Sequence, residues 1–263
     1  MKESIHSFEQ LKNDLGALGI RPGDTVLMHS SYRSLGGVER GAAGFFAAFM
    51  ELLGPEGTLI LPALSYESVT REHPQFHLKE TPSCVGYLPE FFRTHIPGVI
   101  RSMHPTHSCC LLGKHAAELA KDHQLDDTPV GPHSPFAKLP RMGGKILMLG
   151  CGLDCNTSMH GVEETAVPPY LFSDDPRVDY LLYDDDGHEL RQHARRHSFR
   201  IGDDYYEQHY ARVVDLLLPE EASHGKVLNA DAWLLCAASV WRKGAQKLAE
   251  EPFYFVESEK IRP

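Results

Sequence analysis

The sequence predicts a layered α/β/α fold, in which helices cover both faces of a mostly parallel central sheet. The first observation is a set of three continuous apolar runs, at 24–31, 57–64 and 144–150, which are typical of strands buried on both faces. The second is that helical patterns alternate with these runs and form a strand–helix–strand unit early in the chain. The third is size, because 263 residues with 42% hydrophobic and 24% charged side chains suffice for one large α/β domain.

The first half of the chain contains most of the predicted sheet. A helix is expected over 7–19, where Ser7 and Gln10 occupy the capping-box positions and Gly19 ends the helix. Residues 65–84 show no clear period, so we expect a surface loop there. The other expected elements are a strand at 24–31, helices at 41–54, 85–95 and 114–123, strands at 57–64, 108–113 and 144–150, and a Pro-rich loop with a short helix at 128–140.

The C-terminal third has a different pattern. Residues 178–197 alternate around the turn sequence DDDG, which predicts an antiparallel hairpin. Helices are expected over 203–219 and 231–251, and the FYFV run is expected to form a closing strand. We expect one domain over residues 1–263, in which residues 170–230 form a small subdomain.

Composition and charge exclude several classes of function. The formal net charge of −10 argues against nucleic acid, because phosphate binding needs clustered Lys and Arg. The sequence contains no run of about 18 apolar residues, so no membrane-spanning helix is expected. The polar start is unlike a signal peptide, and with six scattered cysteines it predicts a cytoplasmic protein with reduced thiols.

The stretch GCGLDCNTSMHGVEE, at 150–164, admits three interpretations. A zinc site would use Cys151, Cys155 and His160, but no second cysteine pair with suitable spacing follows. A thiol nucleophile would need one of these cysteines next to a base. The third interpretation is a helix that begins after Asn156 or Thr157 and carries a catalytic histidine.

Local rules favour the helix. On a helix that contains His160, the carboxylates of Glu163 and Glu164 lie three and four residues away, and either spacing puts an imidazole and a carboxylate on one face. A carboxylate that holds one ring nitrogen makes the other a better general base. The spacing alone leaves the choice of partner open, and a solvent-facing His–Glu pair is the ordinary alternative.

Two further segments supply polar groups next to predicted strands. MHSSYRSLGG, at 28–37, offers hydroxyls, a guanidinium and backbone N–H groups to phosphate, although it is not a P-loop. RSMHPTHS, at 101–108, places His104 and His107 around a proline just before a strand. Each segment by itself is a weak signal.

Together, in this order, the segments resemble the aminoglycoside 3-N-acetyltransferase family, also called the antibiotic N-acetyltransferase family. The stretches that carry the resemblance cover essentially the whole chain. The most specific are H-S-S-x-R-S-L-G and N-T-S-x-H-x-x-E, and the others are LGPEGTLILPAL, RSMHPTHS, GPHSPFAKL and the C-terminal DAWLLCAASVWRKGAQKLAEEPFYF.

The resemblance implies an α/β fold unrelated to that of the common acetyltransferase superfamily. It implies direct transfer of an acetyl group from acetyl-CoA to an amine, typically the 3-amino group of a 2-deoxystreptamine antibiotic, with no metal and no acyl-enzyme. His160 falls on the family's catalytic histidine and Glu163 on its partner carboxylate. The residues implied to bind coenzyme A are Ser30, Ser31, Arg33, Ser34, Leu35, Gly36, His107, Asn156, Thr157 and Ser158.

A polycationic acceptor agrees with the negative net charge. We expect Glu164, Asp174, Asp175 and Asp184 to contribute acidic groups to the acceptor side. The small-molecule amine is the only partner expected, and the resemblance allows a homodimer. Glu164 and the TAVPPYLF sequence after it depart from many resistance enzymes of the family, and the arginines of HARRHSFR would repel an aminoglycoside if they lined the site.

Three alternatives stay open at this point. One is an acetyltransferase for a different amine, which would keep the dyad and the coenzyme A loop. Another is a metal-dependent hydrolase that uses His104, His107, Cys151, Cys155 and His160. The last is a protein that binds coenzyme A without catalysis.

Overall fold

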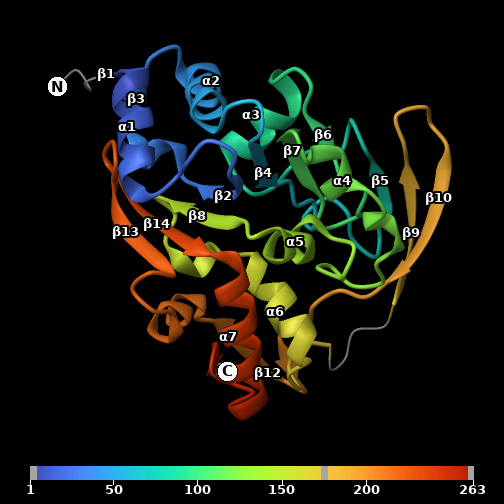
Figure 1. Cartoon of the computed structure of the whole chain (residues 1–263). Helices are drawn as coiled ribbons and strands as arrows, with labels where there is room; N and C mark the ends of the chain where they lie inside the picture. The colour runs from blue at the N-terminus through green and yellow to red at the C-terminus, as the bar shows by residue number, and fades with distance from the viewer. Residues whose placement is uncertain (1–4, 173–176, 260–263) are drawn as a thin grey trace.

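The computed structural model describes residues 5–172 and 177–259, and its centre is a seven-stranded mixed sheet (Figure 1). β2 (Thr25–Ser30) lies in the middle and pairs in parallel with both β4 (Thr58–Pro62) and β8 (Lys145–Leu149). The sheet order is β13-β14-β8-β2-β4-β7-β6, where β6 is Ile100–Arg101, β7 is Cys109–Gly113, β13 is Ala222–Val227 and β14 is Ala230–Cys236.

The expectation of a mostly parallel sheet therefore holds only for the three central strands. All four pairs outside them are antiparallel. β13 and β14 are joined by the tight connection 228–229, which can only link antiparallel neighbours, because parallel neighbours need a crossover of a dozen or more residues.

Helices cover both faces of the sheet, which confirms the three layers predicted from sequence (Figure 1). Alternate residues of β2 point to opposite faces, so Val26 and Met28 enter one apolar core and Leu27 enters the other. The first core contains α1 (Phe8–Leu18), α2 (Gly41–Leu53) and α3 (Tyr87–His95), and the second contains α4 (Ala116–Ala120), α5 (Pro135–Lys138), α6 (Ser158–Ala166) and α7 (Ala237–Glu250).

The C-terminal third differs from the prediction in two places. Where a helix was expected over 203–219, the chain forms β12 (Asp204–Gln208) and then the 3₁₀ segment η5 (Tyr210–Leu216). The helix expected over 231–251 begins only at Ala237, because the residues before it form β14. Both errors have one cause: β12 pairs with β15 (Val256–Glu259) and β14 with β8, and long-range pairing overrides local helical preference.

The predicted hairpin is confirmed. β9 (Val178–Tyr183) and β10 (Glu189–Ala194) pair in antiparallel register, and Figure 1 shows them projecting from the body of the molecule. The loop expected at 65–84 contributes a third strand, β5 (Gln75–His77), whose Phe76 is fully buried in a small core with the hairpin.

The remaining strands are short. They are β1 (Ile5–His6), β3 (Gly37–Val38) and β11 (Arg200–Ile201). Among the described residues, no helix combines the length and the apolar character needed to cross a bilayer.

Candidate active site

A cavity of about 590 Å³ opens at the carboxyl ends of the three central parallel strands. Ser30 at the end of β2, Leu64 just after β4 and Cys151 just after β8 all line it. Open α/β sheets commonly bind ligands at this edge, because the loops after parallel strands meet there.

Parallel pairing of β2 with β8 brings the two most specific sequence segments together. Ser30 is the register partner of Leu149, and the Ser31 N–H donates to the Leu149 carbonyl at 2.9 Å. Gly150 follows with φ +72°, and a Cβ there would lie 1.8 Å from Ser34 Oγ. Glycine is needed at 150 for both reasons, and the 28–37 and 150–164 segments pack directly against each other.

The His160–Glu163 pair forms as the sequence predicts. Both residues lie on α6, and His160 Nδ1 is 3.5 Å from Glu163 Oε2. The Glu163 side chain is fully buried, whereas His160 lines the cavity. The hydrogen bonds of Glu164 go to Thr128, Val130 and His197, so among the described residues it is Glu163 that the structure brings within 3.5 Å of the imidazole.

Two tyrosines that sequence reasoning missed complete this arrangement. The Tyr210 hydroxyl lies 2.9 Å from His160 Nδ1 and donates to Glu163 Oε2 at 2.7 Å. The Tyr170 hydroxyl donates to Glu163 Oε1 at 2.8 Å. Burial raises the pKa of Tyr210 well above its usual value, which keeps the hydroxyl protonated. Because this proton goes to Glu163, the Tyr210 oxygen is available to accept an N–H from His160 Nδ1.

The start of α6 agrees with the prediction, which gave Asn156 or Thr157 as the N-cap. The helix begins at Ser158, and Thr157 occupies the cap position without a side-chain capping bond. The side-chain Oδ1 of Asn156 instead accepts the Ser158 N–H at 3.1 Å, and Ser158 Oγ accepts the Trp241 indole N–H at 2.8 Å. Of these residues only Thr157 lines the cavity, so Asn156 and Ser158 support the helix from behind.

The residues expected to bind coenzyme A are only partly brought to the cavity. Ser30, His107 and Thr157 line it. The others lie behind it or on the surface. Ser31 and Ser34 bond within the turn, Arg33 is exposed, Leu35 is fully buried in the core, and the space beside Gly36 is filled by Asn229.

Glu164 lies behind the cavity wall rather than on the acceptor side. It accepts hydrogen bonds from Thr128 Oγ1 at 2.5 Å, Val130 N at 2.8 Å and His197 Nε2 at 2.7 Å. Burial raises its pKa to about 7. In the structure Glu164 is therefore a hydrogen-bond acceptor for donor groups behind the cavity wall.

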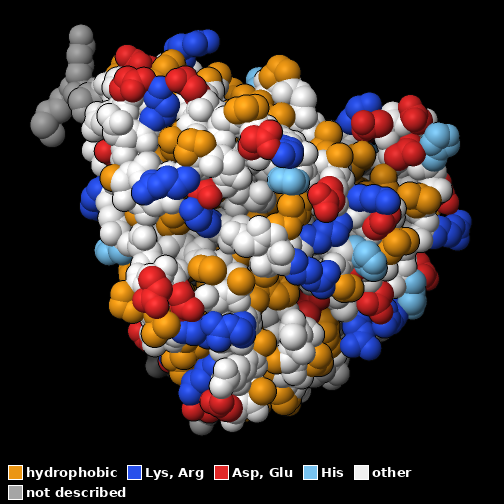
Figure 2. Space-filling view, in the orientation of Figure 1, with side chains coloured by type: hydrophobic (Ala, Val, Ile, Leu, Met, Phe, Trp, Pro, Cys, Tyr) orange, Lys and Arg blue, Asp and Glu red, His pale blue; other side chains and the backbone are white. Residues whose placement is uncertain are grey.

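The other expected acidic residues are not brought to the cavity. Asp184 lies in the β9–β10 turn, where it pairs with His188, and Asp174 and Asp175 fall outside the described residues. Among the described lining residues the one carboxylate is Asp154, and Arg196 is the cation. On the face drawn in Figure 2, acidic and basic side chains are interspersed.

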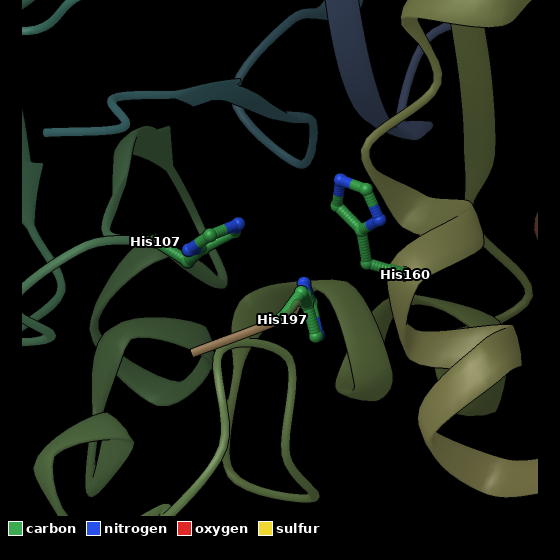
Figure 3. A group of neighbouring side chains, drawn as sticks. All are labelled: His107, His160 and His197. Carbon is green, nitrogen blue, oxygen red and sulfur yellow. The ribbon is translucent and has the colours of Figure 1, made fainter. Parts of the chain in front are cut away.

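Three imidazoles gather at the cavity wall (Figure 3). The ring centroids of His107 and His160 are 5.8 Å apart, those of His107 and His197 are 5.6 Å apart, and those of His160 and His197 are 4.9 Å apart. Burial lowers the pKa of His107 and of His197 well below the usual value, so both rings are neutral near pH 7. Sequence reasoning missed His197, because HARRHSFR drew attention to its arginines.

The residue set expected for a hydrolase does not converge. His104 is fully buried and stacks on His123 with centroids 4.8 Å apart. Cys151 and Cys155 line the cavity, but in the described part of the chain they are not within metal-ligand distance of the histidines. His107 contacts both His104 and His160, and Cys155 contacts Cys151, but among the described residues no three of the five form a group that could hold a metal.

His123 makes the stability of the protein sensitive to acid. Its ring is fully buried, and burial lowers its pKa well below 6.5, so the folded state excludes a proton that the unfolded state binds. The free energy of unfolding therefore decreases as the pH falls below about 6.5, by up to about 1.4 kcal/mol per pH unit for each such group. We expect His123→Gln to reduce this slope between pH 6.5 and 5, as measured by urea unfolding. Identical slopes for wild type and variant would contradict this.

Comparison with known proteins adds a family and several relatives. A family model described as aminoglycoside 3-N-acetyltransferase matches residues 27–249. Aminoglycoside N(3)-acetyltransferase VII of Streptomyces paromomycinus is 36% identical over 177 residues, which span 61% of this chain and 61% of the relative. Aminoglycoside N(3)-acetyltransferase III of Pseudomonas aeruginosa is 31% identical over 92% of this chain and 93% of the relative.

Solved structures share the fold. The binary complex of AAC-IIIb with CoASH superimposes with a TM-score of 0.79 at 30% identity, over 99% of this chain and all of that one. AAC-VIa bound to sisomicin gives a TM-score of 0.75 at 28% identity, over 94% of this chain and 98% of that one. The similarity therefore extends over nearly the whole chain.

Proposed function

Because this chain belongs to the aminoglycoside 3-N-acetyltransferase family, we propose that it transfers an acetyl group from acetyl-CoA to a primary amine of a small molecule. The names of its relatives favour the 3-amino group of 2-deoxystreptamine aminoglycosides as the acceptor. A neighbour bound to CoASH and another bound to sisomicin support the two substrate classes.

The observation that carries the proposal is the hydrogen-bonded chain from His160 through Tyr210 to Glu163. An aminoglycoside amine is largely protonated near pH 7 and attacks a thioester only as the free amine. The free amine forms when its ammonium proton is lost to solvent, and His160 Nε2 then accepts the N–H proton that the nitrogen gives up as it attacks the acetyl carbonyl. The buried carboxylate of Glu163 stabilises the imidazolium that forms, and the thiolate of coenzyme A leaves without an acyl-enzyme.

Hydroxyl groups at the carboxyl edge of the sheet can donate hydrogen bonds to the carbonyl oxygen of the thioester. Ser30 Oγ is buried, lines the cavity and has no hydrogen-bond partner among the described residues. Thr157 lines the same cavity at the start of α6. Donors placed near the carbonyl stabilise the negative charge that develops on its oxygen during transfer.

The direct test is release of free thiol from acetyl-CoA in the presence of a panel of 2-deoxystreptamine aminoglycosides. Turnover that requires both substrates, with one acetyl group on the 3-amino position by NMR, supports the proposal. Binding of acetyl-CoA without turnover on any panel member contradicts the aminoglycoside assignment.

One observation favours a second acceptor class. The cavity wall carries Asp154 as its single described carboxylate, and Arg196 lies beside Tyr66, Phe199 and other aromatic rings. Such a lining suits an amine with one positive charge and an aromatic or anionic group better than a polycation. A panel of monoamines assayed alongside the aminoglycosides distinguishes the two classes by kcat/KM.

Cys155 gives an independent probe of cavity occupancy. Its thiol lines the cavity and its interaction with Cys151 lowers its pKa below the usual value, whereas Cys109 and Cys110 are fully buried. We expect iodoacetamide to modify Cys155 first and saturating acetyl-CoA to slow this reaction, as followed by peptide mass spectrometry. Cys155→Ser is the control, and modification at an unchanged rate would place the cofactor elsewhere.

A further inference from the structure

We propose that His107, His160 and His197 form a binding site for one divalent cation of the zinc class. The three rings come from separate parts of the chain, namely the loop before β7, helix α6 and the segment after β10. One nitrogen from each lies within 4.8 Å of the others, and Figure 3 shows the rings arranged around a common centre. Three imidazoles with an open fourth position are a common zinc arrangement.

Each ring makes a hydrogen-bond contact through one of its two nitrogens. His107 Nδ1 contacts Thr106 Oγ1 at 2.9 Å, and His197 Nε2 donates to Glu164 Oε1 at 2.7 Å. His160 Nδ1 is held by Tyr210 and lies near Glu163. This leaves one ring nitrogen of each residue free, and outer partners of this kind, carboxylates above all, fix the tautomer of histidines that bind metals.

Burial and the carboxylates behind the rings suit a cation, which would lie near the positive charge of Arg196. The His107 and His197 side chains are 7% and 4% exposed, and His160 is 17% exposed toward the cavity. Among the described residues, no hydrogen bond links the three rings to one another, and they meet through ring contacts whose centroids lie 4.9 to 5.8 Å apart. Two buried carboxylates stand behind the rings and can balance a dication.

A fourth histidine faces the same cavity. His29 is 7% exposed and lines the wall, and its Nε2 is buried without a hydrogen-bond partner. A buried imidazole nitrogen left without a partner is costly, and a ligand in the cavity would satisfy it. His29 Nε2 is therefore a further imidazole nitrogen that a ligand in the cavity can contact.

The consequence for activity rests on the proposed function. The lone pair of His160 Nε2 can accept a proton or bind a cation, but not both at once. Stoichiometric zinc is therefore expected to inhibit acetyl transfer, and a chelator is expected to restore it. The metal-free protein is the active form in this scheme.

Cobalt(II) provides a readout that is separate from activity. Metal-free protein is titrated with Co²⁺, and four-coordinate binding gives intense visible absorption that saturates at one equivalent and is displaced by Zn²⁺. We expect His197→Ala and the milder His107→Gln to weaken binding by at least the roughly 10–100-fold that loss of an outer partner costs. His224→Ala is the matched control, because His224 is an exposed imidazole on β13, the outermost strand on one side of the central sheet.

The outcomes separate the two proposals. Absence of saturable absorption in the wild type, or equal binding by correctly folded His197→Ala and His107→Gln, overturns the metal site. Loss of transfer in metal-free His160→Ala supports the proposed base whether or not a metal binds. Activation by one equivalent of zinc supports the site and overturns the role of His160 as a base.

Discussion

Replacing His160 by alanine is expected to reduce kcat/KM for acetyl transfer by ~10²–10⁴, the usual contribution of a general base. The imidazole is the group that lines the cavity, and Tyr210 and Glu163 hold it from behind. Removing it leaves the substrate amine without a proton acceptor, while the acetyl-CoA surface is largely retained. Steady-state thiol release measures the loss, and calorimetric titration with coenzyme A is expected to give an unchanged affinity.

The control for this experiment is His224→Ala, which removes an exposed imidazole on β13, far from the cavity. We expect wild-type turnover from it. A His160→Ala protein that retains more than about one tenth of wild-type kcat/KM would contradict general-base catalysis, since bases contribute at least ~10²-fold. Partial rescue of that variant by added imidazole would support it.

Replacing Glu163 by alanine is expected to lower both stability and turnover. The carboxylate is fully buried and accepts from the hydroxyls of Tyr170 and Tyr210, so its removal leaves two buried donors without an acceptor. Each such group costs about 1–3 kcal/mol. Tyr210 is then free to turn away from His160, so we expect kcat to fall while KM for acetyl-CoA changes little. Urea unfolding and thiol release measure the two effects.

Two variants distinguish the loss of the His160–Glu163 interaction from the loss of a buried carboxylate in general. Glu163→Gln keeps one amide oxygen as an acceptor and is expected to lose less stability than Glu163→Ala, yet it lacks the charge that stabilises the imidazolium. Glu164→Gln alters a largely buried neighbour, 7% exposed, whose partners are Thr128, Val130 and His197. If Glu164→Gln lost as much turnover as Glu163→Gln, the assignment of Glu163 as the partner of His160 would be wrong.

Local patterns were enough to predict the three-layer fold, the hairpin and the spacing of His160 and Glu163. The apolar runs of β2, β4 and β8 are each short and continuous because both faces of those strands are covered, and this pattern is visible without a structure. Similarly, an i, i+3 pair on a helix is fixed by helix geometry alone. The resemblance to a family then chose between Glu163 and Glu164.

Contacts between distant segments could not be predicted. β12 and β14 look helical in isolation and become strands only because β15 and β8 offer them partners. Tyr210 follows β12, so the error in that element also hid the hydroxyl that joins His160 to Glu163. The amino-acid pattern contains no local sign of such a contact.

The sequence by itself determined the layers, the spacing of His160 and Glu163 on one helix face and the segments at the carboxyl edge of the sheet, because each depends on residues close together in the chain. Only the tertiary structure decided which groups face the cavity. It brought His107, His160 and His197 together from three separate segments and placed Leu35 and Glu164 behind the wall. The physical reason is that burial and convergence depend on how the whole sheet pairs and how its loops pack, which no single segment specifies.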